Sequence, residues 1–359
     1  MKKTRKFGRW SELPMDMLRS VLELLTIRDF HRTKIACWNW YLCSKQILRP
    51  KYGSPLLMLS TEEGRCHMYS PGEDRVYETK SDFSGYRFLG SSGRWFLAAD
   101  SRSQLSIIDV FSDERIDLPP VESIKGDLRG VLWVDEKNGD YVVVWQFGSH
   151  EFLGFCKKGD DHYREITTHI GVPVDLKGVY DMVLKGYSLY VLTVHKYIRH
   201  LDLSGQDGFK DVSENQRFPV KTRDLFSENI VVKTSGEVLC VRSKVHETSS
   251  FTRRRTFHVY NTYPEDRDPG TYYYDGDIEL KSLRGEALFL DLGIPVKVAP
   301  DHSLGIEPNS IYFSRGDRYC HKKVSCLDMC VYNLATKTSK PFPGLSNLKV
   351  KDALWFLPR

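Results

Sequence analysis

The sequence predicts a mainly β protein in which a small α-helical module is followed by a six-bladed β-propeller. Three observations support this fold class: an apolar helical stripe within the first 40 residues, short β-type runs separated by turn residues in the remainder, and one strand-and-turn pattern that recurs six times. The expected division is a basic, flexible terminus at 1–9, the helical module at 10–50 and the propeller at 51–359.

The helical module is predicted from the spacing of its apolar residues. Positions i, i+3, i+4 and i+7 are occupied by Leu18, Val21, Leu22 and Leu25, which places them on one face of a helix. Pro14 suits the first turn of this helix, and Asp29 is a candidate N-cap of a second one. A module of about 40 residues seldom builds a sufficient core alone, so it needs a neighbouring domain or a partner.

The segment from Leu13-Pro14 to Trp40 resembles the F-box. It carries a Leu-Pro pair, a helix with one apolar face, an Asp followed by an apolar residue, and an ending similar to V-C-x-x-W. Ala36 and Trp38 depart from the usual pattern. F-boxes bind the Skp adaptor of cullin-based ubiquitin ligases. The resemblance implies that the docking helices and their core include Leu13, Pro14, Leu18, Val21, Leu22, Leu25 and Trp40. Some of these residues must hold the F-box together internally, and the alternative is a helical cap that only packs on the propeller.

The charge of +5 over 359 residues is uneven, because residues 1–50 hold 11 Lys or Arg against 4 Asp or Glu. This excess favours a solvated terminus over a nuclear import signal or a nucleic-acid arm, so no nucleic-acid partner is expected. No run approaches the ~18–20 apolar residues of a membrane span, and the N-terminus lacks the apolar core of a secretory signal. We expect no membrane partner and a location in the nucleus or cytoplasm.

The eight cysteines show no regular spacing, which indicates reduced thiols. The one cluster offers a single C-x3-C pair, too little for a zinc site, and consists of Cys320, Cys326 and Cys330 with His302 and His321. Cys326 and Cys330 are also expected to share one face of a strand. We therefore expect no metal and no cofactor.

The propeller is predicted from a repeat in which an apolar residue, a small residue and a polar turn follow one another. It occurs at Tyr69-Ser70, Ile108-Asp109, Phe155-Cys156, Leu201-Asp202, Tyr260-Asn261 and Tyr332-Asn333. The intervals are 39, 47, 46, 59 and 72 residues, of which the first three match single blades. A seventh blade within the longest interval is the alternative. We expect Asp109, Asp202 and Asn261 to cap turns, and residues 352–357 to pair with Leu56–Ser60 and close the ring.

Residues 55–357 resemble the KIB-type propeller domain of plant proteins, also known as plant domain of unknown function 295. The ordered matches are FLGSSGRWFLAAD with the FSDERIDLPP turn, KSLRGEALFL, NSIYF and the closing NLATKTSKPFPG. Insertions at 244–257 and 263–277 depart from that pattern and are candidate target-binding loops. Their candidate contact residues are Arg253, Arg254, Arg255, Tyr272, Tyr273 and Tyr274. The alternative is a pair of solvated loops whose opposite charges attract each other.

These features predict the substrate-recognition subunit of an SCF-type ubiquitin ligase, which binds the Skp adaptor, through it a cullin, and a protein target of unknown identity. We expect no catalytic residue, because the sequence contains no G-x-x-x-x-G-K-[ST], G-x-S-x-G or H-E-x-x-H motif. A propeller enzyme is disfavoured because 95–100 and 188–194, which we expect to be innermost strands, are apolar. A scaffold without ligase coupling remains the other alternative.

Overall fold

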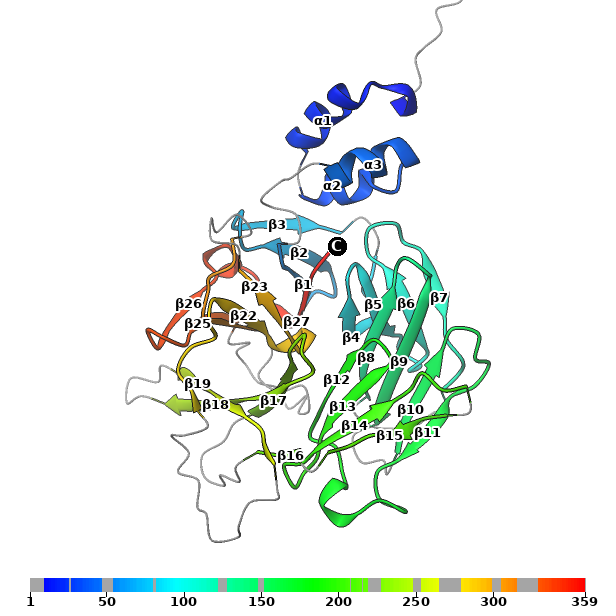
Figure 1. Ribbon diagram of the computed structural model, residues 1–359. Helices are drawn as coiled ribbons and strands as arrows, with labels where there is room; N and C mark the ends of the chain where they lie inside the picture. Colours follow the sequence, from blue (N-terminus) through cyan, green and yellow to red (C-terminus); the bar gives the residue numbers. More distant parts are fainter. Residues whose placement is uncertain are drawn as a thin grey trace, which may run out of the picture.

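Helices form the first part of the chain and strands the rest (Figure 1). The computed structural model describes residues 10–25, 27–46, 54–79, 82–121, 128–147, 152–206, 208–214, 216–218, 227–247, 253–264, 279–298, 305–314 and 329–358. The helical module consists of η1 (Trp10–Glu12), α1 (Met15–Leu24), α2 (Ile27–Thr33) and α3 (Trp38–Gln46). The first strand begins at Leu56.

The start of α1 follows from Pro14, whose backbone at φ −56° and ψ 146° is extended and whose carbonyl accepts the first helical hydrogen bond from Leu18 N at 3.0 Å. Pro14 is therefore the residue before the helix and not part of its first turn. The predicted N-cap role of Asp29 is wrong, because α2 already begins at Ile27. Asp29 lies instead within the first turn, where a carboxylate interacts favourably with the helix dipole.

Six sheets of four or five strands surround a common axis and confirm the six-bladed propeller. From the innermost strand outward, blade 1 is β27 (Val350–Phe356), β1 (Leu56–Thr61), β2 (Cys66–Ser70) and β3 (Arg75–Glu78). Blade 2 is β4 (Arg87–Ser92), β5 (Trp95–Ala99), β6 (Leu105–Asp109) and β7 (Arg115–Asp117). Blade 3 is β8 (Leu128–Asp135), β9 (Asp140–Phe147), β10 (Phe152–Lys157) and β11 (Arg164–Thr167).

The second half of the ring is less regular. Blade 4 is β12 (Asp181–Lys185), β13 (Ser188–Leu192), β14 (Ile198–Asp202) and β15 (Lys210–Asp211). Blade 5 is β17 (Ser227–Val232), β18 (Val238–Glu247), β19 (Arg253–Asn261) and β21 (Glu279–Leu280). Blade 6 is β23 (Ile294–Lys297), β22 (Glu286–Phe289), β24 (Ser310–Phe313), β25 (Cys330–Asn333) and β26 (Thr338–Pro341). A separate pair, β16 (Gln216–Arg217) and β20 (Tyr263–Pro264), completes the strands.

Apolar side chains between neighbouring blades form the core. Six clusters each combine residues of two adjacent blades, so every blade buries both of its faces. In β9, Val143 and Trp145 pack toward blade 2, whereas Val142 and Val144 pack toward blade 4. Because successive side chains of a strand point to opposite faces, a strand buried on both faces needs an uninterrupted apolar run, as YVVVW provides.

The sequence repeat marks the same structural position in every blade. Ser70, Asp109, Asp202, Asn261 and Asn333 end β2, β6, β14, β19 and β25, and Cys156 is the penultimate residue of β10. The predicted capping is confirmed where the chain turns sharply, because Asp109 Oδ1 accepts from Phe111 N at 2.9 Å and Asp202 Oδ1 from Ser204 N at 2.9 Å.

The capping prediction is wrong at Asn261. Its Oδ1 accepts no hydrogen bond from any residue that the structure describes. The reason is that the chain does not turn after β19 but continues nearly at once into β20, which pairs with β16. The longest interval of the repeat contains no seventh sheet among the described residues, because blade 6 fills it with an additional strand, β23.

The ring closes as predicted, because β27 pairs with β1 in an antiparallel register that places Trp355 opposite Leu57. The last described strand thus completes the blade that the first strand begins. Their facing edges pair with each other and are not exposed.

A short turn from blade 6 occupies the axis of the propeller. It is η3 (Leu290–Leu292), and Gly293 follows it at φ +62°. The carbonyl of Gly293 accepts from Val232 N of blade 5 at 2.8 Å, and a methyl group added at Gly293 would lie 2.3 Å from Cγ2 of Val183 in blade 4. The axis is therefore filled by backbone from one blade in contact with two others.

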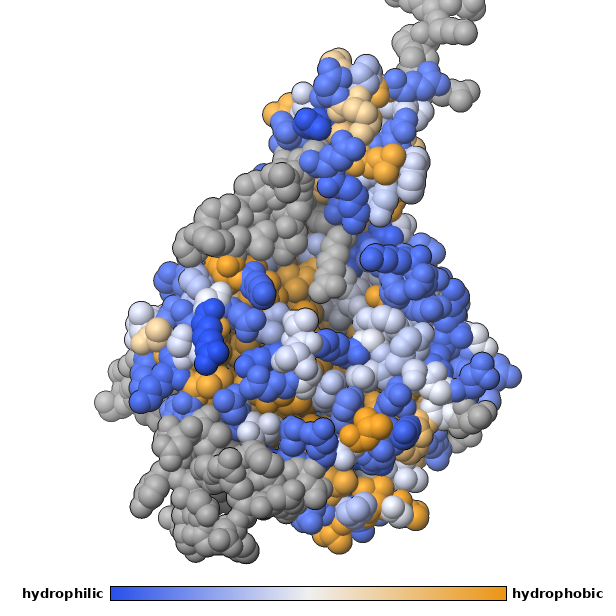
Figure 2. Space-filling view, viewed as in Figure 1, coloured by the Kyte–Doolittle hydropathy of each residue, from blue (hydrophilic) through white to orange (hydrophobic). Residues whose placement is uncertain are grey.

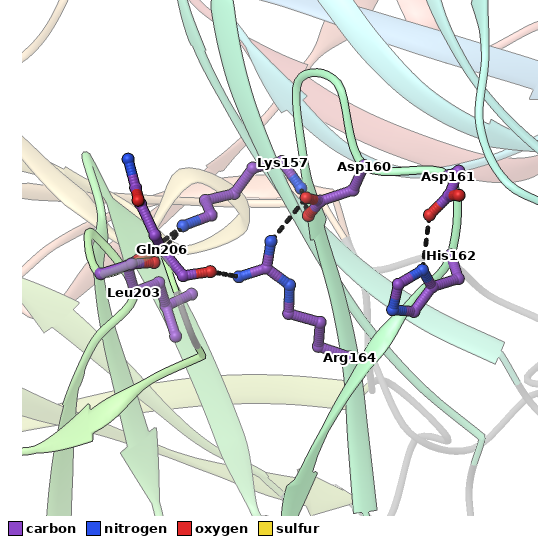
Figure 3. Close-up of polar contacts among 8 residues, drawn as sticks. Lys157, Asp160, Asp161, His162, Arg164, Leu203 and Gln206 are labelled. Atoms are coloured by element: carbon purple, nitrogen blue, oxygen red, sulfur yellow. Dashed lines mark hydrogen bonds and ion pairs between the residues drawn. The ribbon is translucent and has the colours of Figure 1, made fainter.

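Long cationic side chains join neighbouring blades near their turns (Figure 3). Lys157 of blade 3 donates to the carbonyls of Leu203 at 3.0 Å and Gly205 at 2.5 Å in blade 4. Arg164 donates to Gln206 O at 2.6 Å and also pairs with Asp160 at 2.6 Å. Because each ammonium or guanidinium satisfies carbonyls that a turn leaves without partners, these contacts fix the angle between blades.

Two further expectations need correction. The segment 244–257, expected to be a loop, is largely strand, since β18 and β19 form a long hairpin in which Glu247 pairs with Arg253. The apolar segments 95–100 and 188–194, expected to be innermost strands, contain β5 and β13, which are the second strands of their blades.

Candidate protein-docking surface

The helical module has its own small core. Leu18 and Leu22 of α1 are completely buried against Phe30 of α2 and against Trp40 and Cys43 of α3. Helices this short are stable only through such packing, because each alone is below the length at which a helix persists in water. The apolar stripe predicted for α1 therefore builds the inside of the module.

Hydrogen bonds to backbone carbonyls lock α3 onto the beginning of the module. Trp40 Nε1 donates to Trp10 O at 3.2 Å, and Asn39 Nδ2 donates to Ser11 O at 2.7 Å. The thiol of Cys43 contacts Met15 O at 3.5 Å, and burial raises the pKa of this thiol. Trp40 therefore positions η1 from inside the module, and Cys43 positions the start of α1.

The seven residues predicted for adaptor docking fall into two groups. Leu18, Leu22 and Trp40 are buried, so a docked protein would not touch them in this arrangement. Leu13, Val21 and Leu25 are half-buried at the edge of the same core, and Pro14 is exposed. The exposed and half-buried residues remain candidates for direct contact, whereas the other three shape the surface from within.

The largest exposed apolar side chains of α1 lie outside the predicted set. Leu24 is 87% exposed and Met17 is 55% exposed. Together with Val21 they follow the spacing i, i+4 and i+7, which forms a second apolar stripe beside the buried one. This spacing is visible in the sequence and could have revealed the stripe, because a helix with two apolar stripes has more apolar surface than its own core can cover.

A second exposed apolar group lies just before α3 and in its first half. It consists of Ile35, Trp38 and Leu42, of which Trp38 is 67% exposed and stacks on Tyr41 with ring centroids 5.4 Å apart. Figure 2 shows apolar side chains at the surface of the helical module between charged ones. The exposed large hydrophobic side chains among the described residues number ten, and seven of them belong to this module.

The helical module sits on one end of the propeller with α2 and α3 toward the ring and α1 farther away (Figure 1). Lys34, which follows α2, interacts electrostatically with Glu136 in the turn between β8 and β9. Burial, together with the charge of Lys45, lowers the pKa of Lys34 to about 8 against the opposing effect of Glu136. Charges of the module and of the ring therefore interact near the end of α2, whereas α1 keeps its exposed stripe.

Of the residues predicted for target binding, the structure describes only the three arginines, and these lie in a strand instead of a loop. Arg255 lies within β19 with a buried side chain, whose Nη1 donates to Ser243 Oγ at 3.1 Å while its guanidinium covers the Phe313 ring at 4.3 Å. The expectation of an exposed Arg255 is wrong. Arg253 and Arg254 begin the same strand, and Tyr272, Tyr273 and Tyr274 lie outside the described residues.

The buried acids of the ring have structural partners. Glu228 Oε1 pairs with Arg242 Nε at 2.7 Å and its other oxygen with Lys196, and Asp181 Oδ2 accepts from Ile230 N at 2.8 Å.

No group of three or more His, Cys, Asp or Glu within the described ranges is arranged to hold a metal ion. Of the cysteine and histidine cluster at 302–330, only Cys330 lies within the described residues, in β25. No described helix is both long and apolar enough to cross a membrane.

Comparison with known proteins agrees with both parts of this architecture. Residues 68–333 match the model of the KIB1-4 beta-propeller family. The F-box protein At5g25290 of Arabidopsis thaliana is 46% identical over 97% of this chain and 96% of its own length. The F-box protein At2g14290 of the same plant is 47% identical, with 97% of each chain covered. The Arabidopsis F-box/kelch-repeat protein KIB1 is 34% identical over 85% of this chain and 77% of its own length.

Proposed function

Since the chain belongs to the plant F-box proteins that carry a KIB1-4 beta-propeller, we propose that it is the substrate-recognition subunit of a Skp–cullin–F-box ubiquitin ligase. The relatives named as F-box proteins support an adaptor role in general. The observation that carries the proposal is the concentration of exposed apolar side chains on a helical module of fewer than 40 described residues. A soluble domain seldom exposes so much apolar surface unless another protein covers it.

In this proposal the exposed stripe of α1 docks on the Skp adaptor. Met17 and Leu24 are the large side chains that gain most from removal of water, and Val21 joins them at the edge of the core. Pro14 shapes the entry to the helix. The buried residues Leu18 and Leu22 contribute by holding the stripe in place.

The propeller would hold the target while the other subunits transfer ubiquitin. This chain then supplies no catalytic group, because a tethered target meets the charged conjugating enzyme at a high effective concentration. The buried acids of the ring are consistent with this role, since Glu228 and Asp181 already have cationic or amide partners.

The test measures binding of the full chain to purified Skp adaptor by calorimetry. A Met17→Ser, Leu24→Ser variant should bind roughly tenfold or more weakly, because two large apolar anchors are lost while the core is untouched. The matched control is Ile170→Ser, which removes an exposed apolar side chain from the propeller and should leave adaptor binding unchanged. Equal affinity of the α1 variant and the intact protein would refute docking through this stripe.

Coupling to the ligase is tested separately. A complex reconstituted with the adaptor, a cullin and a conjugating enzyme should assemble with the intact chain and lose this subunit with the α1 variant. If the adaptor binds but the cullin complex never includes this chain, the protein is a scaffold and the ligase role is excluded.

A further inference from the structure

The propeller itself exposes a second apolar surface. The large hydrophobic side chains that are exposed on the described part of the ring are Ile170, Val174 and Val194, at 74%, 62% and 49%. All three come from two neighbouring segments of blades 3 and 4, namely the connection 168–180 before β12 and the turn 193–197 between β13 and β14. We call these three residues the lower patch.

The connection that carries Ile170 and Val174 is closed on itself by hydrogen bonds. Gly178 N donates to Thr168 O at 3.2 Å, which joins the two ends of the loop. Within it, η2 (Val174–Leu176) forms a tight turn in which Lys177 N donates to Val174 O at 3.1 Å. Val174 is thus held on an ordered turn, with its side chain directed to solvent instead of into a core.

The second segment is fastened to the first. Thr193 Oγ1 donates to Asp175 O at 3.0 Å and accepts from Tyr197 N at 3.1 Å, so one hydroxyl ties both segments together. Gly178 packs against Val194 so closely that an added methyl group would lie 3.1 Å from its Cγ1. The two segments that carry the lower patch are therefore held in place relative to each other before a partner binds, which lowers the entropic cost of binding.

We infer that the lower patch is the docking site for a short apolar segment of the protein target. This inference rests on the proposed function and names the place where the target would be held. The patch lies at the end of the molecule opposite the helices, where Figure 1 shows the connection after β11 and Figure 2 shows apolar surface. A target segment and the adaptor could then bind at the same time without contact.

Size selects a short segment over a second copy of this chain. The exposed fractions correspond to an apolar area on the order of 300 Å², against about 800 Å² per partner for a stable protein interface. An area of this size suits one or two apolar anchor residues of a peptide and a weak, reversible contact. A target can be retained by a ligase without a tighter contact at this patch, because other contacts in the assembly add binding energy.

Charge also decides between partner classes. The two segments that present the patch carry three charged side chains, Asp175, Lys177 and Lys196. Lys196 pairs with the buried Glu228 of blade 5, so the remaining charges of Asp175 and Lys177 balance. A membrane with anionic lipids or a nucleic acid would require a net basic surface, which this balance does not provide. The branched aliphatic side chains instead match apolar side chains of another protein.

The experiment uses the full chain bound to purified Skp adaptor and a phage-displayed library of random dodecapeptides as the probe. Peptides are selected on the intact protein after depletion on an Ile170→Ser, Val174→Ser variant. Selected synthetic peptides should share apolar anchors, bind the intact chain in the micromolar range, and bind the variant about tenfold more weakly. Ile35→Ser is the matched control, because it removes an exposed branched aliphatic side chain that belongs neither to the lower patch nor to the stripe of α1, and it should not change peptide binding.

Three outcomes would overturn the inference. The first is that no peptide distinguishes the intact chain from the patch variant. The second is a dimer in sedimentation measurements that the patch variant abolishes, which would make a second copy the occupant. The third is patch-dependent binding to phosphatidylcholine vesicles. Adaptor binding is measured in the same samples, so failure of the patch and failure of the proposed ligase role give different results.

Discussion

Asp291 Oδ2 accepts a 3.0 Å hydrogen bond from the backbone amide of Trp355, and this contact joins the axial turn η3 to the strand that closes the ring. The Ser314 hydroxyl lies within hydrogen-bonding reach of the same oxygen and of Ala353 O, the latter at 3.1 Å, and can donate its single proton to either. Among the described residues, no strand pairs with the inner side of β27. A carboxylate therefore replaces the strand that would otherwise satisfy the Trp355 amide.

Replacing Asp291 with Ala should weaken ring closure. The variant loses a charge-assisted hydrogen bond inside the protein, which costs about 2 kcal/mol in the free energy of unfolding. Hydrogen exchange at the Trp355 amide is the direct measurement and should become faster. Asp291→Asn retains an oxygen acceptor and should lie between the two. Unchanged protection of this amide in Asp291→Ala would contradict the assigned role.

Gly293→Ala should destabilise the propeller by about 3 kcal/mol. Part of the cost is the left-handed backbone at φ +62°, and the rest is overlap with Val183 across the axis. The measurement is the free energy of unfolding in urea. Gly186→Ala is the matched control, since Gly186 has φ +63° and no neighbouring atom within 4 Å of an added methyl group. Equal effects of the two variants would show that axial packing contributes nothing.

The contacts between blades 3 and 4 give a third prediction. Lys157→Met removes the ammonium group that donates to two carbonyls of blade 4. The substitution should lower the free energy of unfolding by about 1.5 kcal/mol. Lys158→Met is the control at the adjacent position, because its Nζ is 3.7 Å from Asp140 on the surface and such pairs contribute little. A loss as large for Lys158→Met as for Lys157→Met would argue against a specific role of the inter-blade contact.

Lys34 gives a prediction in pH. Its pKa in the folded protein, about 8, lies below the ordinary lysine value of 10.5, so the unfolded chain binds more protons between these two values. Stability should therefore rise with pH across this window through the Lys34 contribution, and that gain is absent below pH 8. Lys34→Met removes the contribution.

The measurement compares the urea midpoints of the intact chain and Lys34→Met at pH 7.5 and pH 10. The difference between the two proteins isolates Lys34 from cysteines and tyrosines that titrate in the same range. The urea midpoint of the intact chain should rise relative to that of Lys34→Met as the pH increases. A difference that stays constant would mean that the Lys34 ammonium is not desolvated in the folded protein.

The blade count could be predicted from the sequence because each repeat lies at or next to the end of the next-to-outermost strand of its blade, and in several blades a polar side chain caps the turn that follows. Asp109 and Asp202 illustrate this local chemistry. The axial turn could not be predicted, because Asp291 and Gly293 act through contacts with Trp355 and Val183, which are distant in sequence. Local patterns carry no information about such partners.

The burial of Arg255 was predictable in principle. Arg255 and Phe257 are two residues apart in a strand and share one face, and Phe257 is buried. Three consecutive arginines are typical of an exposed loop, but in a strand they alternate between the two faces, so one of them can be buried. The exposed stripe of α1 is visible in the same way, because Met17 and Leu24 repeat at a helical spacing beside the buried Leu18 and Leu22.

The pairing of β27 with β1 has a consequence for synthesis on the ribosome. The helical module is complete after residue 46, whereas blade 1 must wait for residues 350–356. Translation emits residues from the N-terminus onward, so the helical module leaves the ribosome hundreds of residues before the strand that closes the ring. Under the proposed function, a prematurely terminated polypeptide would compete for the adaptor while carrying an open propeller, and cells that make such fragments would sequester adaptor without recruiting targets.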